Sequence, residues 1–488
     1  MKFIKTDIAV VAAGPAGLAA AAAALEGGAD VCVFEKSNVS GGAANMGMGP
    51  FAVESHIQQR AMDPLTKEKA FEEYMEYNYW NVDAKIVRDY FFRSADTIEW
   101  LESMGVEFFG AMKNFPSSHQ TWHVVKPEGG GMPGARCAGA MNKKIQEYCQ
   151  EKGGHFYFET PVTDLIKTDG KITGLHAKAA DGTEYEVEAK AVIVATGGFG
   201  TNPEMVKECT DYTLLKDMFT FMVPGVVGDG IKMVWDVGGM HGRMMMEKIQ
   251  GNTIPGAATG EYPGFLCFMQ GSPIAVNKYG YRVCNEIVMQ NPSLHANIID
   301  MQQDRSVFKI LDDKMIKLFA KKGLEFPSEV FPGDPTIDFD ERWTDAAEKF
   351  PDCAFVADSI EELAEKMGMD PEILTETVDT YNDYCEQNYD EDFFKPRKYL
   401  KPLDGKKFYG YRFSVGAYGS LGGIKTNHRY EVLDKEGKVI PGLYGAGNDA
   451  NEIYNGTYCY YFPGNTMGFA INSGRFAGEN AAEYISES

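Results

Sequence analysis

Apolar runs and glycine-rich turns alternate along the first half of the chain and return near its end. Residues 7–11 (DIAVV) and 30–34 (DVCVF) are short apolar runs of the kind found in strands that are buried on both faces. Between them lies an alanine-rich helical stretch, residues 17–25, and a third apolar run at 189–195 leads into further glycines. This order predicts a doubly wound α/β sheet that begins with a strand–turn–helix–strand unit.

The middle of the chain follows a different pattern. Residues 246–404 lack the alternation of strands and glycine turns, and their stretches 359–367 and 371–384 have apolar residues at helical spacing. Residues 405–488 resume the first pattern. The sequence therefore predicts one α/β domain made of residues 1–245 and 405–488, interrupted by an inserted α+β domain of residues 246–404.

The first turn carries candidate chemistry. Residues 12–17 read AAGPAG, a dinucleotide-binding turn of the G-x-G-x-x-G kind with Ala12 in place of the first glycine. In such a turn Gly14 lets the backbone approach a pyrophosphate, Gly17 lets the helix pack on the strand, and the helix N-terminus presents N–H donors. Glu35 follows the second strand 18 residues after Gly17, where an acidic side chain accepts the ribose hydroxyls.

Further glycine tracts favour FAD over NAD as the dinucleotide. Residues 37–49 form a long glycine-rich segment where a simple dehydrogenase begins another helix. Glycines also cluster at 197–200, 442–447 and 464–468, and the last cluster precedes a helical stretch, residues 469–485, whose N-terminus is suited to the flavin O2 and N1. Such tracts allow the backbone to lie close against an extended cofactor.

Composition and charge exclude several classes of partner. Glycine makes up 53 of 488 residues, about 11 % against an average of about 7 %, and much of the excess falls in these tracts. The net charge of −23 repels phosphate backbones and anionic lipids, which predicts no nucleic-acid partner and no membrane partner. Nine scattered cysteines include no C-x-x-C pair and no zinc-like spacing, so we expect no metal; with no secretory leader, they predict a cytoplasmic protein.

Taken together, the motifs resemble the flavoprotein subunits of fumarate reductase and succinate dehydrogenase, and their relatives the 3-ketosteroid dehydrogenases. The resemblance spans nearly the whole chain, and it includes the first turn and residues 35–42, 195–198 (ATGG), 228–230 (GDG), 275–286, 421–423 (LGG) and 442–447 (GLYGAG). It implies a Rossmann-like FAD-binding domain, with the inserted segment as a capping domain that carries part of the substrate site. Residues 37–52 lack the histidine that tethers FAD in succinate dehydrogenases, which implies non-covalent FAD.

The resemblance also implies a set of FAD contacts. One of them, Asn448, stands where the family has a glutamate after Gly-Ala-Gly. The implied contacts are Ala13, Gly14, Pro15, Ala16, Glu35, Lys36, Ser37, Gly42, Ala43, Ala44, Asn45, Gly47, Val162, Ala195, Thr196, Gly197, Asn202, Asp229, Gly419, Gly447, Asn448, Asn465, Thr466 and Met467.

The chain departs from the family where fumarate reductases hold a dicarboxylate. Asn252 replaces the histidine of the Gln-x-His-Pro-Thr motif, and Gln290 stands at about the position of the proton-donating arginine. Tyr418 and Gly419 occupy the place of a histidine, and Tyr461 matches the arginine that clamps a carboxylate. A buried dicarboxylate needs paired cations, so these replacements predict a neutral pocket.

Tyrosines dominate this predicted pocket. Tyr454, Tyr458, Tyr460 and Tyr461 fall within eight residues and offer flat apolar faces with hydroxyl tips, which suits a ring-bearing ligand anchored by a carbonyl or a phenol. We expect Tyr461 and Tyr418, followed by Tyr460, to act as acid and anchor, since a tyrosine with a pKa of about 10 can protonate an enolate. The expected substrate contacts are Asn252, Gln290, Tyr458 and Tyr454.

The sequence thus predicts an FAD-dependent oxidoreductase that reduces, or introduces, an activated C=C bond in a neutral cyclic, aromatic or steroid-like carbonyl compound. One alternative is an anaerobic reductase of an unsaturated carboxylate such as fumarate, urocanate or a cinnamate-like acid. Another is a flavin electron-transfer subunit that needs a partner. The sequence carries no second dinucleotide motif and no haem or iron–sulfur ligand pattern, so we expect electrons from NAD(P)H, free reduced flavin or a redox protein.

Overall fold

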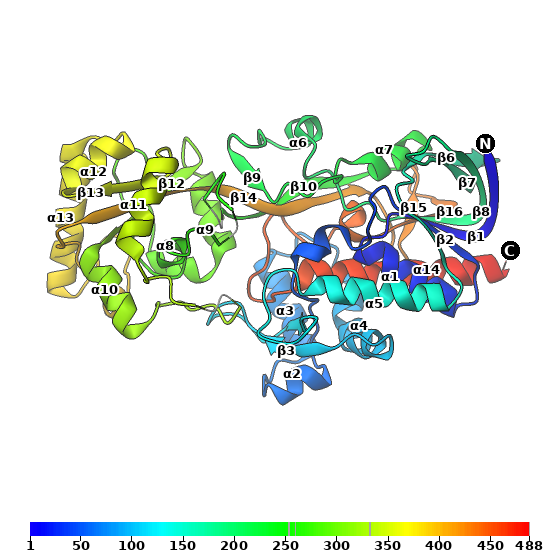
Figure 1. Ribbon diagram of the computed structural model, residues 1–488, viewed down its shortest axis with the longest axis horizontal. Coiled ribbons are helices and arrows are strands. Elements are labelled where there is room, and N and C mark those ends of the chain that lie inside the picture. The colour runs from blue at the N-terminus through cyan, green and yellow to red at the C-terminus, as the bar shows by residue number, and fades with distance from the viewer. Residues whose placement is uncertain (252–253, 259, 331–332, 488) are drawn as a thin grey trace.

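A computed structural model describes residues 1–488 except 252–253, 259, 331–332 and 488. An eight-stranded sheet forms the lobe at the right of Figure 1. Its parallel core pairs β1 with β2 and β8, β2 with β5, and β8 with β16, and the remaining strands join it antiparallel. The strands are β1 (Lys2–Val11), β2 (Val31–Phe34), β5 (His155–Tyr157), β6 (Val162–Thr168), β7 (Lys171–Lys178), β8 (Glu184–Val194), β15 (Glu431–Leu433) and β16 (Val439–Gly445). The apolar runs predicted as strands match β1, β2 and β8 at their C-terminal ends to within one residue, which confirms the predicted α/β class.

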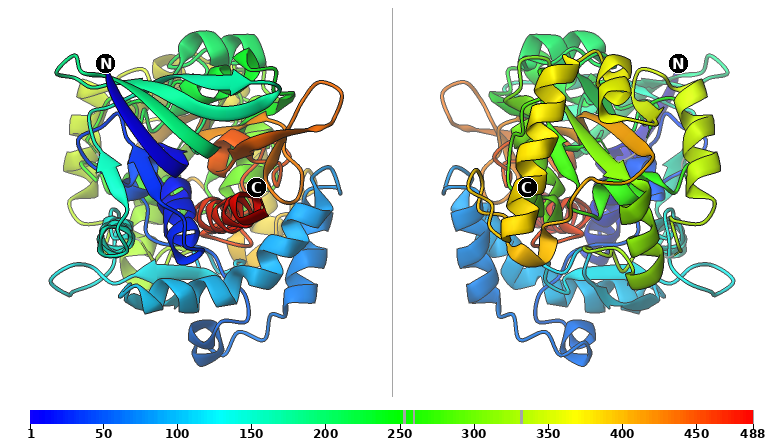
Figure 2. Two further views of the ribbon diagram at one scale, coloured as in Figure 1. Left: turned by 90° about the vertical axis from the view of Figure 1, so that its right-hand side faces the viewer. Right: turned by 90° about the vertical axis from the view of Figure 1, so that its left-hand side faces the viewer.

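Two helices from opposite ends of the chain pack against each other in this lobe. They are α1 (Pro15–Glu26) and α14 (Asn465–Glu487), which lie side by side in Figure 1 and in the left panel of Figure 2. Gly474 and Gly478 let the two backbones approach closely. A Cβ on Gly474 would overlap the carbonyl oxygen of Ala16, and one on Gly478 would overlap that of Ala20. This contact fixes the N-terminus of α14 relative to the first turn.

The other elements of this lobe surround the sheet and the two helices. The hairpin β3–β4 and helices α2 to α5 lie on the side of α1 away from the sheet, and both chain termini lie at the far end of the lobe, which faces the viewer in the left panel of Figure 2. The elements of this lobe outside the sheet and the two helices are η1 (Gly42–Met46), α2 (His56–Arg60), α3 (Lys67–Tyr77), α4 (Ala84–Ser103), β3 (Phe108–Met112), β4 (Trp122–Val125), α5 (Ala138–Glu151), α6 (Pro203–Cys209), α7 (Asp229–Asp236) and η4 (Gly447–Ala450).

A second, six-stranded sheet connects the two lobes. Its central strand, β14 (Phe408–Ile424), pairs over its first half with β12 (Ser306–Asp312) and over its second half with β10 (His241–Gln250). Figure 1 shows β14 running from the left lobe into the right one. The other strands are β9 (Met218–Thr220), β11 (Ile274–Val276) and β13 (Ala354–Ala357).

Helices cover the second sheet in the left lobe. The stretches predicted as amphipathic helices form α12 (Ile360–Met367) and α13 (Pro371–Gln387). The domain boundary predicted at 245/246 falls inside β10, and the one at 404/405 precedes β14, so paired strands cross between the lobes at both places. The remaining helices are α8 (Phe265–Met269), η2 (Glu286–Gln290), α9 (Pro292–Asp300), α10 (Asp313–Lys322), α11 (Phe339–Lys349) and η3 (Arg397–Tyr399).

Within the described residues, no helix combines the length and the apolar character that crossing a membrane requires.

Candidate active site

The first turn, between β1 and α1, is shaped for close approach of an anion. Helix α1 has no side-chain cap and no acidic residue in its first turn, so nothing there competes for its N–H groups. A Cβ on Gly17 would overlap the carbonyl oxygen of Ala12, which explains why helix and strand can meet here only through glycine. A Cβ on Gly14 would meet nothing nearer than the Ala195 carbonyl oxygen at 4.0 Å, which leaves the turn open on that side.

Glu35 ties the end of β2 to this turn. Its two carboxylate oxygens accept hydrogen bonds from the backbone N–H groups of Ala13 and Ser37, each at 2.7 Å. Each oxygen has a further lone pair, so these bonds leave room for the predicted ribose contact. The backbone role of Glu35 was not foreseen, because it depends on the position of Ala13 beside the strand end.

The glycine tracts that the sequence assigned to FAD meet in space. Each contact joins two segments that are distant in the chain. The distances run from the position that a Cβ on the glycine would occupy to the nearest atom of the other segment. The contacts are Gly42 to Gly14 Cα (3.8 Å), Gly447 to Ala16 Cβ (2.9 Å), Gly47 to Met467 Cε (2.5 Å) and Gly419 to Asn448 Nδ2 (3.5 Å).

Asp449 binds the 195–198 tract, and the sequence did not indicate this role of Asp449. This fully buried carboxylate accepts hydrogen bonds from the backbone N–H groups of Thr196 and Gly198 and from the Thr196 hydroxyl, the last at 2.9 Å. Burial raises the pKa of Asp449 to about 6, although these hydrogen bonds oppose the shift. A lone acid directly after a glycine turn was its sequence signal, and it lay next to the expected contact Asn448.

Several expected cofactor contacts also bond within the protein. Lys36 forms an ion pair of 2.6 Å with Asp229. Asn202 caps α6 and donates to the Val227 carbonyl oxygen, and Asn45 donates to the Ser40 carbonyl oxygen. These bonds orient the side chains without assigning them to a ligand.

The start of α14 holds unpartnered polar atoms. Asn465 is fully buried, and neither its amide nitrogen nor its amide oxygen has a hydrogen-bond partner among the described residues. Leaving a buried amide unsatisfied costs about 1–3 kcal/mol, so a bound group is expected to complete it. The flavin ring, which carries both N–H and C=O groups, fits this need. The open turn, the adjoining glycine tracts and this amide are therefore suited to FAD.

Glu247, on β10, faces the same helix start. Its Oε1 accepts a hydrogen bond from the Thr466 hydroxyl, while its Oε2 has no partner. Burial raises the pKa of Glu247 to about 8, so the carboxyl group is mainly protonated at pH 7. Sequence reasoning missed this residue because an acid beside Lys248 in a methionine-rich run looks like a solvent-facing position until the strand is placed in the sheet.

Tyr460, which is buried, and Tyr418, which is partly buried, form a close pair. Their phenolic oxygens lie 2.8 Å apart, and the ring of Tyr458 packs against both, with centroids at 5.0 and 4.9 Å. Burial raises the pKa of Tyr418 to about 12 and that of Tyr460 well above its ordinary value. In the described part of the chain, no Lys, Arg or His side chain forms a hydrogen bond or ion pair with these three side chains. The cluster is therefore a set of neutral hydroxyl donors on apolar rings.

Two other tyrosines of the predicted cluster lie apart from this pair. Tyr461 is partly exposed, packs edge-on against Tyr77 at 5.3 Å and interacts with the Asn291 side chain. The Tyr454 hydroxyl lies 3.0 Å from that of Thr466, on the side of Glu247. The structure thus brings Tyr418 and Tyr460 together, while Tyr461 makes separate contacts.

The two polar substrate contacts expected in the capping region are less defined. Gln290 ends η2, and its carbonyl oxygen accepts a hydrogen bond from the Ser117 hydroxyl at 3.3 Å. Asn252 lies outside the described residues.

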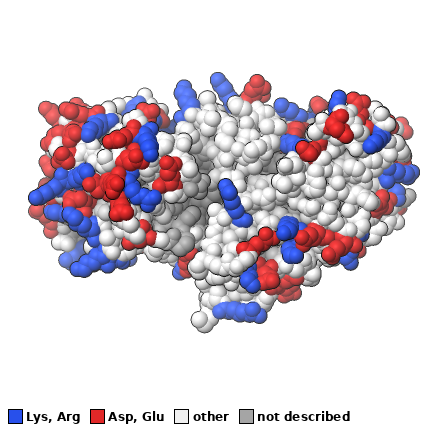
Figure 3. All heavy atoms as spheres, in the orientation of Figure 1, with Lys and Arg blue, Asp and Glu red and all other residues white. Residues whose placement is uncertain are grey.

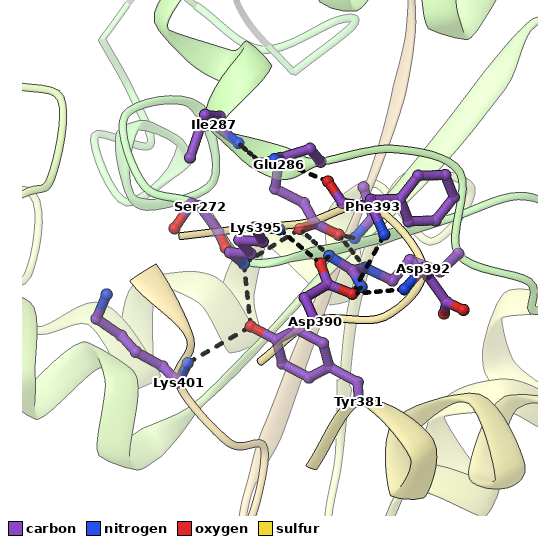
Figure 4. A network of polar contacts seen from close by, with 12 residues as sticks. Ser272, Glu286, Ile287, Tyr381, Asp390, Asp392, Phe393, Lys395 and Lys401 are labelled. Carbon is purple, nitrogen blue, oxygen red and sulfur yellow. Dashed lines mark hydrogen bonds and ion pairs between the residues drawn. The ribbon is translucent and has the colours of Figure 1, made fainter. Parts of the chain in front are cut away.

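Two buried cations of the capping region, Arg282 and Lys395, are engaged within the protein. Arg282 binds Glu286 and Asp390 with N···O distances of 2.7 to 2.8 Å, and Lys395 lies 3.2 Å from Glu286. Figure 4 shows Glu286, Asp390 and Lys395 in this buried network. Two carboxylates thus already use the Arg282 guanidinium. The Arg282 guanidinium is therefore not free to pair with a substrate carboxylate.

His295 is the buried histidine of this region. Its Nδ1 lies 2.6 Å from the Gln250 Oε1, and burial holds its pKa well below the ordinary value. His295 is therefore neutral and cannot replace the missing cationic clamp.

Comparison with known proteins agrees with this geometry. A family model described as an FAD binding domain matches residues 7–460. A vinyl phenol reductase of Lactiplantibacillus plantarum is 32 % identical over 487 residues, covering 98 % of this chain and 96 % of that protein. A fumarate reductase (cytochrome) of Shewanella frigidimarina is 29 % identical, covering 98 % of this chain and 77 % of that protein.

Among solved structures, a 3-ketosteroid Δ4-(5α)-dehydrogenase from Rhodococcus jostii has a TM-score of 0.74 and 21 % identity, covering 98 % of this chain and 97 % of that one. A 3-ketosteroid Δ1-dehydrogenase from Sterolibacterium denitrificans has a TM-score of 0.75 and 19 % identity, covering 98 % and 99 %. At these identities the likeness concerns the fold.

Proposed function

The chain belongs to the FAD binding domain family, and from that premise we propose that it is an FAD-dependent reductase of a C=C bond conjugated to a neutral aromatic or cyclic group. The observation that carries the proposal is the hydrogen-bonded Tyr418–Tyr460 pair, which offers hydroxyl groups and no charge. The L. plantarum relative is a vinyl phenol reductase, and reduction of a vinyl phenol is the chemistry that such a pair suits.

The expected division of labour follows from the residues present. Bound FAD, when reduced, supplies a hydride from N5. The first turn, the 195–198 tract and the start of α14 would hold FAD, and we expect this binding to be non-covalent. Tyr418 and Tyr460 hold hydroxyl protons beside one another, so one can anchor a phenol or carbonyl oxygen while the other donates a proton.

The rings around this pair favour a flat substrate. Tyr458 packs edge-on against both members, and Phe221 lies parallel to Tyr418 with a centroid distance of 5.7 Å. Aromatic faces of this kind pack well on a ring-bearing ligand and exclude water from it. In Figure 3 the charged side chains gather on the left lobe and around the rim of the right one, and the middle of this face carries few.

Carboxylate substrates are the competing possibility, because fumarate and urocanate reductases are among the relatives. A buried carboxylate without a paired cation costs several kcal/mol. Here Arg282 is occupied and His295 is neutral, which argues against that substrate class.

The electron donor lies outside this chain in the proposal. NAD(P)H, free reduced flavin and a redox protein each meet the need. Anaerobic addition of NADH or NADPH to the pure protein distinguishes them, since direct bleaching of the flavin dispenses with a protein donor.

Reoxidation of the dithionite-reduced protein tests the substrate class. We expect 4-vinylphenol and cyclic enones to reoxidise the flavin at least about tenfold faster than fumarate, urocanate or 4-hydroxycinnamate at equal concentration, equivalent to about 1.4 kcal/mol of discrimination. The vinylphenol and hydroxycinnamate pair is the sharpest comparison, because the two differ by one carboxylate. Preference for fumarate would overturn the neutral-site proposal.

A further inference from the structure

Glu247 is an acid that the proposed chemistry leaves unused. It is fully buried in β10, and no ion pair involves it in the part of the chain that the structure describes. Its Oε1 is bound by Thr466, and the Thr466 hydroxyl lies 3.0 Å from that of Tyr454. Its Oε2 has no partner, although an unpartnered buried carboxyl oxygen is costly. This acid therefore lies beside Thr466, an expected FAD contact, and its Oε2 lacks a hydrogen-bond partner.

Among the described residues, the titratable groups that interact electrostatically with Glu247 are tyrosines. They come from α3, from β14 and from the segment between η4 and α14, and each interacts electrostatically with the Glu247 carboxyl group. They are Tyr74, Tyr418, Tyr454, Tyr458 and Tyr460. None of them is charged at neutral pH, so none forms an ion pair with a carboxylate. Hydrogen bonding from Tyr454 and Thr466 opposes the rise in the Glu247 pKa, and burial outweighs it. Lys248, the next residue on the strand, is paired at 2.7 Å with Asp300.

We propose that Glu247 is kept as a neutral carboxylic acid in the resting protein and serves as the proton reserve of the active site. The inference rests on the proposed reductase function for its catalytic part, while the protonation state of Glu247 does not depend on it. The geometry that supports it is the buried, cation-free carboxyl group, its hydrogen-bonded link through Thr466 to Tyr454, and the free Oε2.

The proton balance of one turnover shows what the reserve does. Reduction adds one hydride and one proton across the C=C bond. When the proton leaves a hydroxyl of the Tyr418–Tyr460 pair, a phenolate remains. In the proposal, a proton from the Glu247 carboxyl group then restores the hydroxyl and leaves a carboxylate at Glu247. The hydrogen-bonded chain from Glu247 reaches Tyr454, so the proton crosses from there to the pair during turnover. One proton from solvent restores the carboxyl group before the next turnover.

The relative acidities make this transfer favourable. Burial pushes the tyrosines well beyond their ordinary pKa, so each is a poor long-term holder of negative charge, whereas Glu247 ionises close to neutral pH. A buried acid that titrates near the working pH is the arrangement that general acid–base catalysis favours.

Infrared spectroscopy tests the resting state without any turnover. In the FAD-loaded protein at pH 7 we expect the carbonyl stretch of a protonated carboxylic acid, absent from Glu247→Gln and lost from wild type with a midpoint near pH 8. If Glu247→Gln does not fold, ¹³C-glutamate labelling of wild type identifies the band. A wild-type spectrum without a protonated glutamate at pH 7 overturns the proposal, whatever the substrate proves to be.

Kinetics as a function of pH tests the reserve itself. Glu247→Gln retains the partner for Thr466 and cannot release a proton, so we expect turnover at pH 7 to fall about tenfold or more. At pH 9 the two proteins should converge, because Glu247 is already ionised in wild type. Glu436→Gln, at an exposed position, is the matched control and should match wild type at both pH values. An equal loss at both pH values would mean that Glu247 is only structural and would overturn the proposal.

Discussion

The phenolic oxygens of Tyr418 and Tyr460 lie 2.8 Å apart, although the residues are 42 positions apart in the chain. Tyr418 stands on β14 and Tyr460 on the segment that leads into α14, so the pair forms only when the second sheet and the C-terminal helix are in place. The pair therefore presents two neutral hydroxyl groups together, in keeping with the neutral pocket that the sequence predicts.

Removal of one hydroxyl from this pair should impair turnover. We expect Tyr460→Phe to lower the turnover rate by about 10²-fold or more, as for loss of a positioned acid, while the ring packing is retained. Steady-state rates with the preferred alkene give the measurement. Tyr461→Phe is the matched control, because Tyr461 packs on Tyr77 instead, and it should lose less than about fivefold. The reverse order would favour Tyr461, which the sequence alone suggested, as the acid.

Asp449 should control FAD affinity through the 195–198 tract. In Asp449→Asn, an amide NH₂ must face one of the backbone N–H groups that the carboxylate oxygens now accept from, so we expect a loss of about 1–3 kcal/mol. Fluorescence titration of the apoprotein with FAD should show about tenfold weaker binding. Exposed Asp352→Asn serves as the control. Unchanged FAD affinity would show that the tract keeps its shape without Asp449.

Gly474 should be intolerant of any side chain. A Cβ there would overlap the Ala16 carbonyl oxygen, so Gly474→Ala must push α14 away from α1. We expect about 1–3 kcal/mol less free energy of unfolding, together with weaker FAD binding, measured by denaturant titration. Gly139→Ala, also in a helix, places its Cβ 3.8 Å from the nearest atom and should be neutral or stabilising. Equal stability of the two variants would contradict the close packing.

The protonation of Glu247 predicts how stability depends on pH. Its pKa is raised from 4.5 to about 8 in the folded protein, so the folded state binds the proton more tightly than the unfolded state does. The contribution to stability is therefore fully present below about pH 4.5 and is lost as the pH rises through about 8. A shift of this size corresponds to about 5 kcal/mol at most.

Denaturant titrations of the apoprotein between pH 5 and 9 measure this effect. The difference in free energy of unfolding between wild type and Glu247→Gln should change steadily in favour of the variant as the pH rises. A difference that does not vary with pH would mean that Glu247 has an ordinary pKa.

The sequence alone determined the class of fold and the identity of the cofactor. Apolar runs of strand length, an alanine-rich helix and glycines at fixed spacing are local features, and the backbone geometry they permit is largely set by neighbouring residues. The strands β1, β2 and β8 and the helices α1, α12, α13 and α14 could therefore be predicted, and so could the replacement of a cationic clamp by tyrosines.

Only the tertiary structure decided which groups work together. Tyr460 and Tyr461 are neighbours in sequence, yet Tyr460 contacts Tyr418 on β14 and Tyr461 contacts Tyr77 on α3. Asp449 and Glu247 look ordinary in the sequence, and their raised pKa values arise from burial that only the assembled lobes produce. Pairing and desolvation are properties of distant segments in contact, so local residue patterns cannot specify them.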